Sequence, residues 1–187
     1  IMRVGVYGLG RFGSFWAQAL ARHAEVRAWS RDPTHPAPPG VKRVSEQEVL
    51  AEPAVFFCVA ISAFEEVLVR AAPRIPSGTL VMDTCSVKVH PADLLRRLLA
   101  PSGSVLATHP MFGPDSAAES LEGLPMVLSP VRIAPAELER WQRFFASLGL
   151  SVSVMDPDEH DRQAAFTQGV THYIGRVLKE LGVAPSA

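Results

Sequence analysis

The feature that most constrains the fold is a glycine-rich turn near the N-terminus, where Gly8, Gly10 and Gly13 stand in a G-x-G-x-x-G spacing. A short apolar run, residues 4–7, precedes the turn, and large apolar residues follow it at helical intervals over residues 12–20. The order of strand, glycine turn and helix is typical of folds that bind dinucleotides. In such a turn the glycines permit the sharp bend, the approach of a pyrophosphate and close packing of the helix. A βα turn that binds no ligand is the alternative.

The rest of the chain alternates between apolar segments and helical ones. Continuous apolar runs such as residues 54–60 are typical of strands that helices cover on both faces. We expect one Rossmann-type, doubly wound α/β domain over residues 1–155, with a mainly parallel sheet of seven or eight strands and antiparallel pairing open for the later ones. Strands are predicted at residues 25–29, 54–60, 79–83, 104–107, 125–129 and 151–155, and helices at residues 45–50 (opened by a Ser45/Glu48 capping box), 63–72, 92–99 and 135–148.

Composition argues against several classes of partner. A net charge of -1 gives no electrostatic footprint for nucleic acid or for an anionic membrane surface. The longest apolar run, residues 54–63, is about half the length that a membrane span needs, and no signal peptide is expected. Cys58 and Cys85 stand alone in apolar runs, which is typical of reduced thiols. We therefore expect a cytoplasmic protein with no nucleic-acid or membrane partner.

The end of the second predicted strand bears on the choice of cofactor. Folds of this kind that bind NAD usually carry an acidic residue there, which hydrogen-bonds the ribose 2′-OH. In this chain Ser30 and Arg31 come first, and an arginine suits the 2′-phosphate of NADP. Asp32 follows one residue later and would restore an acidic candidate if the strand ended there; an ordinary solvated turn is the other alternative. We expect NADP, with NAD less favoured.

Polar residues stand at the carboxyl ends of two later strands, where open α/β sheets bind their ligands. Ser86 and Lys88 follow the strand at residues 79–83, and the alternative for them is a helix-capping serine and a surface lysine. His109 follows the strand at residues 104–107. A histidine in this place is a candidate general base, and a structural histidine is the alternative.

The last segment, residues 156–187, changes to a helical pattern capped by Asp156. Asp161, Gln168 and His172 fall on one face of this helix, and a solvated face is the ordinary explanation of such a stripe. The histidines of the segment lack the H-E-x-x-H spacing, so no metal site is expected.

Taken in order, these blocks resemble the prephenate/arogenate dehydrogenase family of tyrosine biosynthesis, and look closest to its NADP-dependent arogenate dehydrogenases. The T-H-P-M-F-G-P and E-H-D-R blocks are the most specific. The matching stretches run from end to end of the chain and are G-L-G-R-F-G at residues 8–13, Ser30-Arg31, D-T-C-S-V-K at 83–88, T-H-P-M-F-G-P-D at 108–115, and E-H-D-R-Q-A-A at 159–165, continuing to residue 178.

The resemblance implies an NADP-dependent oxidative decarboxylation of prephenate or arogenate. Ring carbon C4 gives hydride to the nicotinamide, its hydroxyl loses a proton, carbon dioxide leaves C1, and the ring becomes aromatic. His109 would take the hydroxyl proton and Ser86 would hydrogen-bond that histidine or the hydroxyl. His172, Gln168 and Asp115, where some members have Glu, would contact the substrate. The implied cofactor-binding residues are Gly8, Gly10, Arg11, Phe12, Gly13, Ser30 and Arg31.

The family pattern also includes a further helical domain, which forms a homodimer and supplies an arginine to the substrate carboxylate. This chain would hold only the first helix of that domain, at residues 156–187, so that either the chain is truncated or a partner subunit completes the site. Apolar positions along residues 158–181 favour a homodimer. Two other functions stay open: a related dehydrogenase or reductase acting on another hydroxy or imino acid, and a non-catalytic NADP(H)-binding module.

Overall fold

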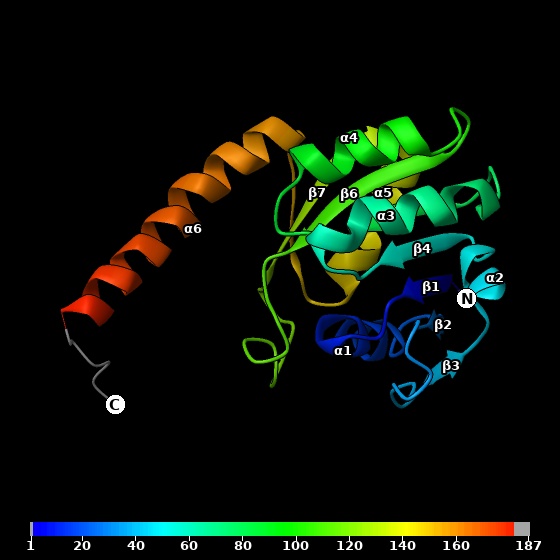
Figure 1. The fold of residues 1–187 in the computed structure, drawn as a ribbon, viewed down its shortest axis with the longest axis horizontal. Helices are drawn as coiled ribbons and strands as arrows, with labels where there is room; N and C mark the ends of the chain where they lie inside the picture. The colour runs from blue at the N-terminus through cyan, green and yellow to red at the C-terminus, as the bar shows by residue number, and fades with distance from the viewer. Residues whose placement is uncertain (1, 182–187) are drawn as a thin grey trace.

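A computed structural model describes residues 2–181, except for the side chains of Gln168, Thr171, His172 and Lys179. Within these residues an eight-stranded sheet carries helices on both faces, and the last helix extends away from the body (Figure 1). The strands are β1 (Arg3–Tyr7), β2 (Glu25–Trp29), β3 (Val41–Arg43), β4 (Ala54–Phe57), β5 (Leu80–Asp83), β6 (Ser104–Pro110), β7 (Pro125–Arg132) and β8 (Ser151–Val154). The helices are α1 (Arg11–Leu20), α2 (Glu46–Leu50), α3 (Ile61–Ala71), the 3₁₀ turn η1 (Ala72–Arg74), α4 (Val89–Leu98), α5 (Pro135–Ser147) and α6 (Pro157–Glu180).

The strand order is β3-β2-β1-β4-β5-β6-β7-β8. The first six strands in this order run parallel, β7 runs antiparallel to β6, and β8 runs parallel to β7. From β1 the sheet grows in one direction through β2 and in the other through β4, so a crevice forms at the carboxyl ends of β1 and β4. The Rossmann-type, doubly wound and mainly parallel sheet is therefore confirmed.

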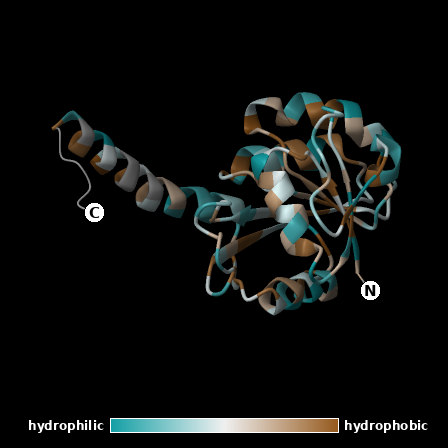
Figure 2. Cartoon of the chain, turned by 90° about the horizontal axis from the view of Figure 1, so that it is seen from below, coloured by the Kyte–Doolittle hydropathy of each residue, from teal (hydrophilic) through white to brown (hydrophobic). Residues whose placement is uncertain are grey.

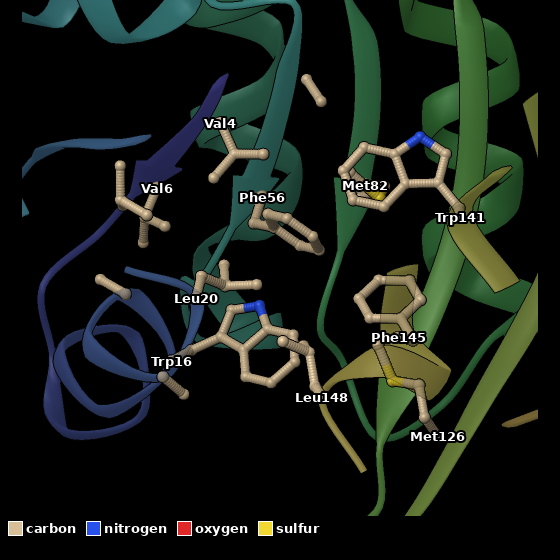
Figure 3. Packing of buried hydrophobic residues seen from close by; sticks show 14 of the residues in the cluster. Val4, Val6, Trp16, Leu20, Phe56, Met82, Met126, Trp141, Phe145 and Leu148 are labelled. Carbon is tan, nitrogen blue, oxygen red and sulfur yellow. The ribbon is translucent and has the colours of Figure 1, made fainter. Parts of the chain in front are cut away.

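Alternate residues of the strands between the two edges of the sheet enter two apolar clusters, one on each face of the sheet. Val6 and Tyr7 are neighbours in β1, yet Val6 packs with α1 and α5 while Tyr7 packs with α2, α3 and α4. Figure 3 shows the aromatic centre of the first cluster. There the Phe56 ring of β4 lies edge-on to Trp16 of α1 and to Trp141 of α5, with ring centroids 5.8 Å apart in both pairs. These contacts hold α1, and with it the glycine turn at its start, against the sheet.

Several elements differ from their predicted bounds; β4 ends at Phe57 rather than at residue 60, for example, and β7 runs to Arg132 rather than to residue 129. β6 runs to Pro110, three residues past its predicted end, so His109 lies within a strand that pairs with β7. The edge strand β3 was not predicted, because three residues carry too little periodicity to be recognised. α4 begins at Val89 rather than at Ala92, since the first turn of a helix tolerates the proline at position 91.

The last helix, α6, contacts α4 and β7 and then leaves the domain (Figure 1). Figure 2 shows apolar residues along the projecting part. Phe166, Tyr173 and Leu181 are at least 70% exposed there. Residues 182–187 of the predicted second domain lie outside the described residues. Between residues 2 and 181, no helix combines the length and the apolar character that crossing a membrane requires.

Candidate active site

The glycine turn joins β1 to α1 at the crevice. Gly8 has a φ of +108°, a region that glycine adopts without steric strain. A Cβ atom on Gly13 would lie 1.9 Å from the carbonyl oxygen of Gly8, so α1 and the turn touch backbone to backbone. A Cβ atom on Gly10, by contrast, would meet no atom within 4 Å. The fold therefore requires the first and third glycines, and the second leaves open space beside the start of α1.

That open space has the donors that a phosphate group needs. The N-cap of α1 is Gly10, which has no side chain to accept from the N–H groups of the first turn, and that turn holds no acidic residue. Such N–H groups and the helix dipole attract anions. The turn opens into a cleft of about 280 Å³ between the ends of β1, β2 and β4. These residues fit the pyrophosphate of a dinucleotide, and their contact with one stays a prediction.

The end of β2 forms the far wall of the same cleft. β2 ends at Trp29 as predicted, so Ser30 and Arg31 come directly after it, and both line the cleft. Arg31 is exposed, and within residues 2–181 it makes no hydrogen bond or ion pair. The Asp32 carboxylate accepts from the hydroxyl and the backbone N–H of Thr34, at 2.6 and 2.8 Å, and these bonds lower the pKa of Asp32. Asp32 is thus engaged in its own turn, whereas Arg31 is available to a ligand.

Arg43 of β3 supports this wall from outside the cleft, and sequence analysis missed it. Its guanidinium donates to the backbone carbonyls of Ser30 at 3.2 Å and Asp32 at 3.0 Å, and also to that of His35. Three carbonyl acceptors on one guanidinium fix the conformation of the loop after β2. Backbone acceptors carry no sequence signature, so no motif could have indicated this contact.

A second, wider hollow of about 790 Å³ adjoins the cleft at the ends of β4, β5 and β6. The two cavities share Val59 in their linings, so they lie side by side. Ser86 and His109 line this hollow together, and Phe12 of α1 lines it as well. The structure therefore brings these predicted residues to one place.

His109 is almost fully buried in the wall of the hollow, with 4% of its surface exposed. Its Nδ1 atom lies 2.8 Å from Nε2 of His160 on α6. Burial, with smaller effects of His160 and Lys88, lowers the pKa of His109 to about 4. The ring is therefore neutral at pH 7 and able to accept a proton. Within residues 2–181, Ser86 makes no hydrogen bond with His109, so its predicted contact with a substrate hydroxyl stays a prediction.

His160 is a site residue to which sequence analysis gave no function. It is 2% exposed, and its Nδ1 atom lies 2.7 Å from Oδ1 of Asp161. Asp161 in turn accepts from the backbone N–H groups of Lys88 and Val89, at 2.6 and 2.9 Å. The specificity of the E-H-D-R block was the signal that could have drawn attention to His160. Asp161 thus faces α4, while the side chains of Gln168 and His172, predicted to bind substrate, lie outside the described residues.

Lys88 does not lie on the surface of the site. Its side chain is fully buried and forms an ion pair with Asp83, which is also fully buried, and it donates to the carbonyl oxygen of Thr108. The structure makes Lys88 an internal link between β5 and β6. Both sequence-based alternatives for it, a surface lysine and a polar group of the ligand crevice, are wrong because the ammonium group is enclosed.

Arg11 and Asp115, predicted to bind cofactor and substrate, form an ion pair with each other. The pair joins the first turn of α1 to the loop after β6, and the two side chains are 72% and 81% exposed. Exposed pairs contribute only about 0–1 kcal/mol, so a ligand can displace either partner. The predicted contacts of these two residues stay predictions.

Comparisons with known proteins agree with this arrangement. The family model described as "Prephenate dehydrogenase, nucleotide-binding domain" matches residues 39–154. The chain is 36% identical to arogenate dehydrogenase 2, chloroplastic, of Arabidopsis thaliana, over 99% of this chain and 55% of that protein. It is 33% identical to arogenate dehydrogenase 1, chloroplastic, of the same plant, over 97% of this chain and 30% of that protein. The chain thus spans about half or less of the length of these curated relatives.

Two solved structures share the fold. The prephenate dehydrogenase from A. aeolicus in complex with hydroxyphenyl propionate and NAD+ has a TM-score of 0.79 and 20% identity, and the match covers 97% of this chain and 69% of that one. The arogenate dehydrogenase from Synechocystis has a TM-score of 0.75 and 24% identity, with 88% of this chain and 63% of that one covered.

Proposed function

This chain belongs to the prephenate dehydrogenase family, and we propose on that premise that it carries out the NADP-dependent oxidative decarboxylation of arogenate or prephenate in tyrosine biosynthesis. One observation carries the proposal. A neutral, buried histidine, His109, lines a hollow that adjoins a glycine-lined cleft through Val59. A base and a dinucleotide site side by side are what a dehydrogenation needs.

The reaction removes a proton and a hydride from the same alcohol carbon. The hydroxyl on ring carbon C4 gives its proton to Nε2 of His109, and C4 loses its hydrogen as hydride. The bond from C1 to the carboxylate then breaks and carbon dioxide leaves. The electron pair of that bond moves through the ring to the C4 oxygen, which takes up a proton and becomes the phenol. The nicotinamide, when bound, supplies the acceptor for the hydride.

The residues of this chain place and activate the alcohol. His109 takes the proton, a contribution of about 10²–10⁴ in rate for a well-placed base. Ser86, on the same hollow, donates its O–H to the oxygen of the substrate hydroxyl, whose own proton goes to His109. His172, Gln168 and Asp115 hold the remainder of the substrate in this proposal. Because aromatisation supplies much of the driving force, alignment of C4 is the main task of the protein.

For the cofactor, we propose NADP in preference to NAD. Gly8, Gly10 and Gly13 would hold the pyrophosphate, with Arg11 and Phe12 beside it at the start of α1. The guanidinium of Arg31, which has no partner within residues 2–181, lies in the cleft wall and supports a 2′-phosphate contact with the help of Ser30. The engagement of Asp32 with Thr34 argues against an acidic contact to a free 2′-OH.

A homodimer through α6 is part of this proposal. Apolar side chains that no other part of residues 2–181 covers lie along the helix, including Phe166, Val170, Ile174 and Leu178. An exposed apolar face of this length is typical of an association surface. Light scattering at micromolar concentration should give twice the chain mass, and a monomer would contradict this proposal.

A cytoplasmic location is also proposed, since Cys58 and Cys85 are both free thiols. The two Arabidopsis relatives are named chloroplastic. Fractionation of the source cells, with detection of the chain by antibody, tests this point.

The function is tested by incubating the purified chain with NADP and either arogenate or prephenate and following absorbance of the reduced nicotinamide. Reduction that depends on one of the two substrates supports the proposal. Cofactor binding without any substrate-dependent reduction would identify a non-catalytic NADP(H)-binding module. Reduction only with other hydroxy acids, or oxidation of NADPH by imino acids, would identify a related dehydrogenase or reductase.

A further inference from the structure

We propose that His160 and Asp161 form a positioning relay that sets the tautomer of His109 and leaves its Nε2 atom unprotonated toward the hollow. The inference deepens the proposed function and rests on His109 as the base of that reaction. No part of it depends on a bound ligand, because the three side chains already contact one another.

The relay is anchored at Asp161. Its carboxylate accepts from two backbone N–H groups, those of Lys88 and Val89, at the point where α4 begins. The first N–H groups of a helix have no partner within the helix, and the helix dipole favours a negative charge there. Although burial raises the pKa of Asp161, the hydrogen bonds from Val89, His160 and Lys88 outweigh it and lower the pKa below its ordinary value. Asp161 is therefore a carboxylate, which can only accept hydrogen bonds.

This acceptor determines which nitrogen of each histidine carries the proton. Nδ1 of His160, 2.7 Å from Asp161, must be the donor of that hydrogen bond. In a neutral imidazole the other nitrogen is then an acceptor, so Nε2 of His160 accepts from Nδ1 of His109 across 2.8 Å. The second nitrogen of His109, Nε2, is left with a lone pair. That is the form of the ring that can take a proton from an alcohol in the hollow.

Burial keeps water from competing for the two hydrogen bonds that join Asp161, His160 and His109. His109 and His160 are 4% and 2% exposed, so solvent has little access to either shared nitrogen. The two rings come from β6 and α6, with centroids 5.0 Å apart and planes inclined by 70°. Once His109 is protonated, Asp161 favours its positive charge, since it raises the pKa of His109 against the effect of burial. The start of α6 thus contributes His160 and Asp161 to a site whose base, His109, belongs to the sheet.

The tautomers can be observed directly by NMR on the ¹⁵N-histidine-labelled chain at pH 7.5, with no substrate present. Long-range ¹H–¹⁵N correlations distinguish the two neutral tautomers, and the His109→Asn and His160→Gln variants assign the signals. The proposal predicts that His109 and His160 are both protonated on Nδ1. Free imidazoles favour Nε2–H, so an Nε2–H signal for His109 in the unmodified chain would overturn the proposal.

Two substitutions of His160 separate the hydrogen bond from mere packing. His160→Leu fills the buried space without an acceptor, and His109 should revert to the Nε2–H tautomer. His160→Gln keeps an oxygen acceptor close to the same place, and His109 should stay protonated on Nδ1. An unchanged His109 tautomer in the leucine variant, with the other histidine signals in their folded positions, would overturn the relay.

Turnover provides the second readout. Asp161→Ala removes the carboxylate that accepts from Nδ1 of His160, so the tautomers of the two histidines are no longer fixed, and kcat should fall about 100-fold. Asp158→Ala removes an exposed carboxylate three residues earlier in the same helix and should leave kcat unchanged. Equal effects of the two variants would overturn the relay. Nδ1–H signals in a chain that shows no turnover would instead contradict the proposed function and leave the relay standing.

Discussion

Lys88 and Asp83 form an ion pair in which both side chains are fully buried. Asp83 also accepts from the backbone N–H groups of Cys85 at 3.0 Å and Thr108 at 3.2 Å, and Lys88 donates to the carbonyl oxygen of Thr108. The pair therefore ties the end of β5 to the residue directly before His109. His109, the base of the proposed reaction, is therefore held next to a buried ion pair.

Replacement of Lys88 by methionine should strongly destabilise the fold. The substitution leaves the carboxylate of Asp83 buried without a counterion, and the free energy of unfolding should fall by about 3–5 kcal/mol. Urea unfolding at pH 7 measures the change. Lys42→Met, which removes an exposed lysine from β3, should change the same quantity by less than about 0.5 kcal/mol. Equal stability of the two variants would contradict the account of this ion pair.

The three glycines of the turn should respond differently to alanine. In Gly13→Ala the new Cβ would overlap the carbonyl oxygen of Gly8, so unfolding should become easier by about 3 kcal/mol or more. In Gly10→Ala the Cβ meets open space, and stability should stay within about 1 kcal/mol of the parent chain. The affinity of Gly10→Ala for NADP, measured by fluorescence titration, should nevertheless fall at least about tenfold, because the Cβ occupies the space proposed for a phosphate. Full NADP affinity in this variant would contradict the assignment of the phosphate site to the space beside Gly10.

Arg31 should determine the preference for NADP. Loss of a charge-assisted contact to a 2′-phosphate in Arg31→Ala should weaken NADP binding about 10- to 100-fold and leave NAD binding unchanged. Arg96→Ala, which removes an exposed arginine from α4, should affect neither cofactor. Calorimetry with both cofactors provides the measurement. If the parent chain binds NAD as tightly as NADP, the assignment of Arg31 is wrong.

Acid should destabilise the chain through His109. Burial lowers the pKa of this group from its ordinary value of 6.5 to about 4. Between these two pH values the unfolded chain binds a proton that the native chain does not. The free energy of unfolding therefore falls as the pH falls through this window, and the contribution of His109 is fully present above it. Urea unfolding at 25 °C measures this effect. Between pH 7.5 and pH 4.5 the free energy of unfolding should fall by about 2 kcal/mol more in the parent chain than in His109→Asn. Equal losses would show that the native ring is protonated as easily as the unfolded one.

The parts of the fold that local patterns determine were predictable. The capping box of Ser45 and Glu48 is present at the start of α2, and β4 lies within the apolar run that predicted it. The glycine turn also has the predicted form, since its spacing encodes contacts between close neighbours in the chain. Ser86 and His109 were predicted to meet because the carboxyl ends of parallel strands share one edge of a sheet.

The contacts that sequence analysis missed join residues far apart in the chain. His109 and His160 are separated by 51 positions, and nothing in the pattern of either segment specifies that α6 docks against the end of β6. In the sequence Lys88 follows its strand as a surface residue would. Its burial becomes evident only from the structure, where it forms an ion pair with the buried Asp83. Arg43 binds backbone carbonyls, which every residue carries. Local periodicity therefore located the site, and tertiary packing determined its hydrogen bonds.

In the proposed reaction His109 removes the proton of the substrate hydroxyl, and the most direct test compares the parent chain with His109→Asn. Both proteins are mixed with saturating NADP and with arogenate or prephenate, and reduction of the nicotinamide is followed in a stopped-flow instrument. We expect the variant to bind NADP as the parent does and to reduce it about 10²- to 10⁴-fold more slowly. Reduction at equal rates in the two proteins, or none by the parent chain with either substrate, would contradict the account.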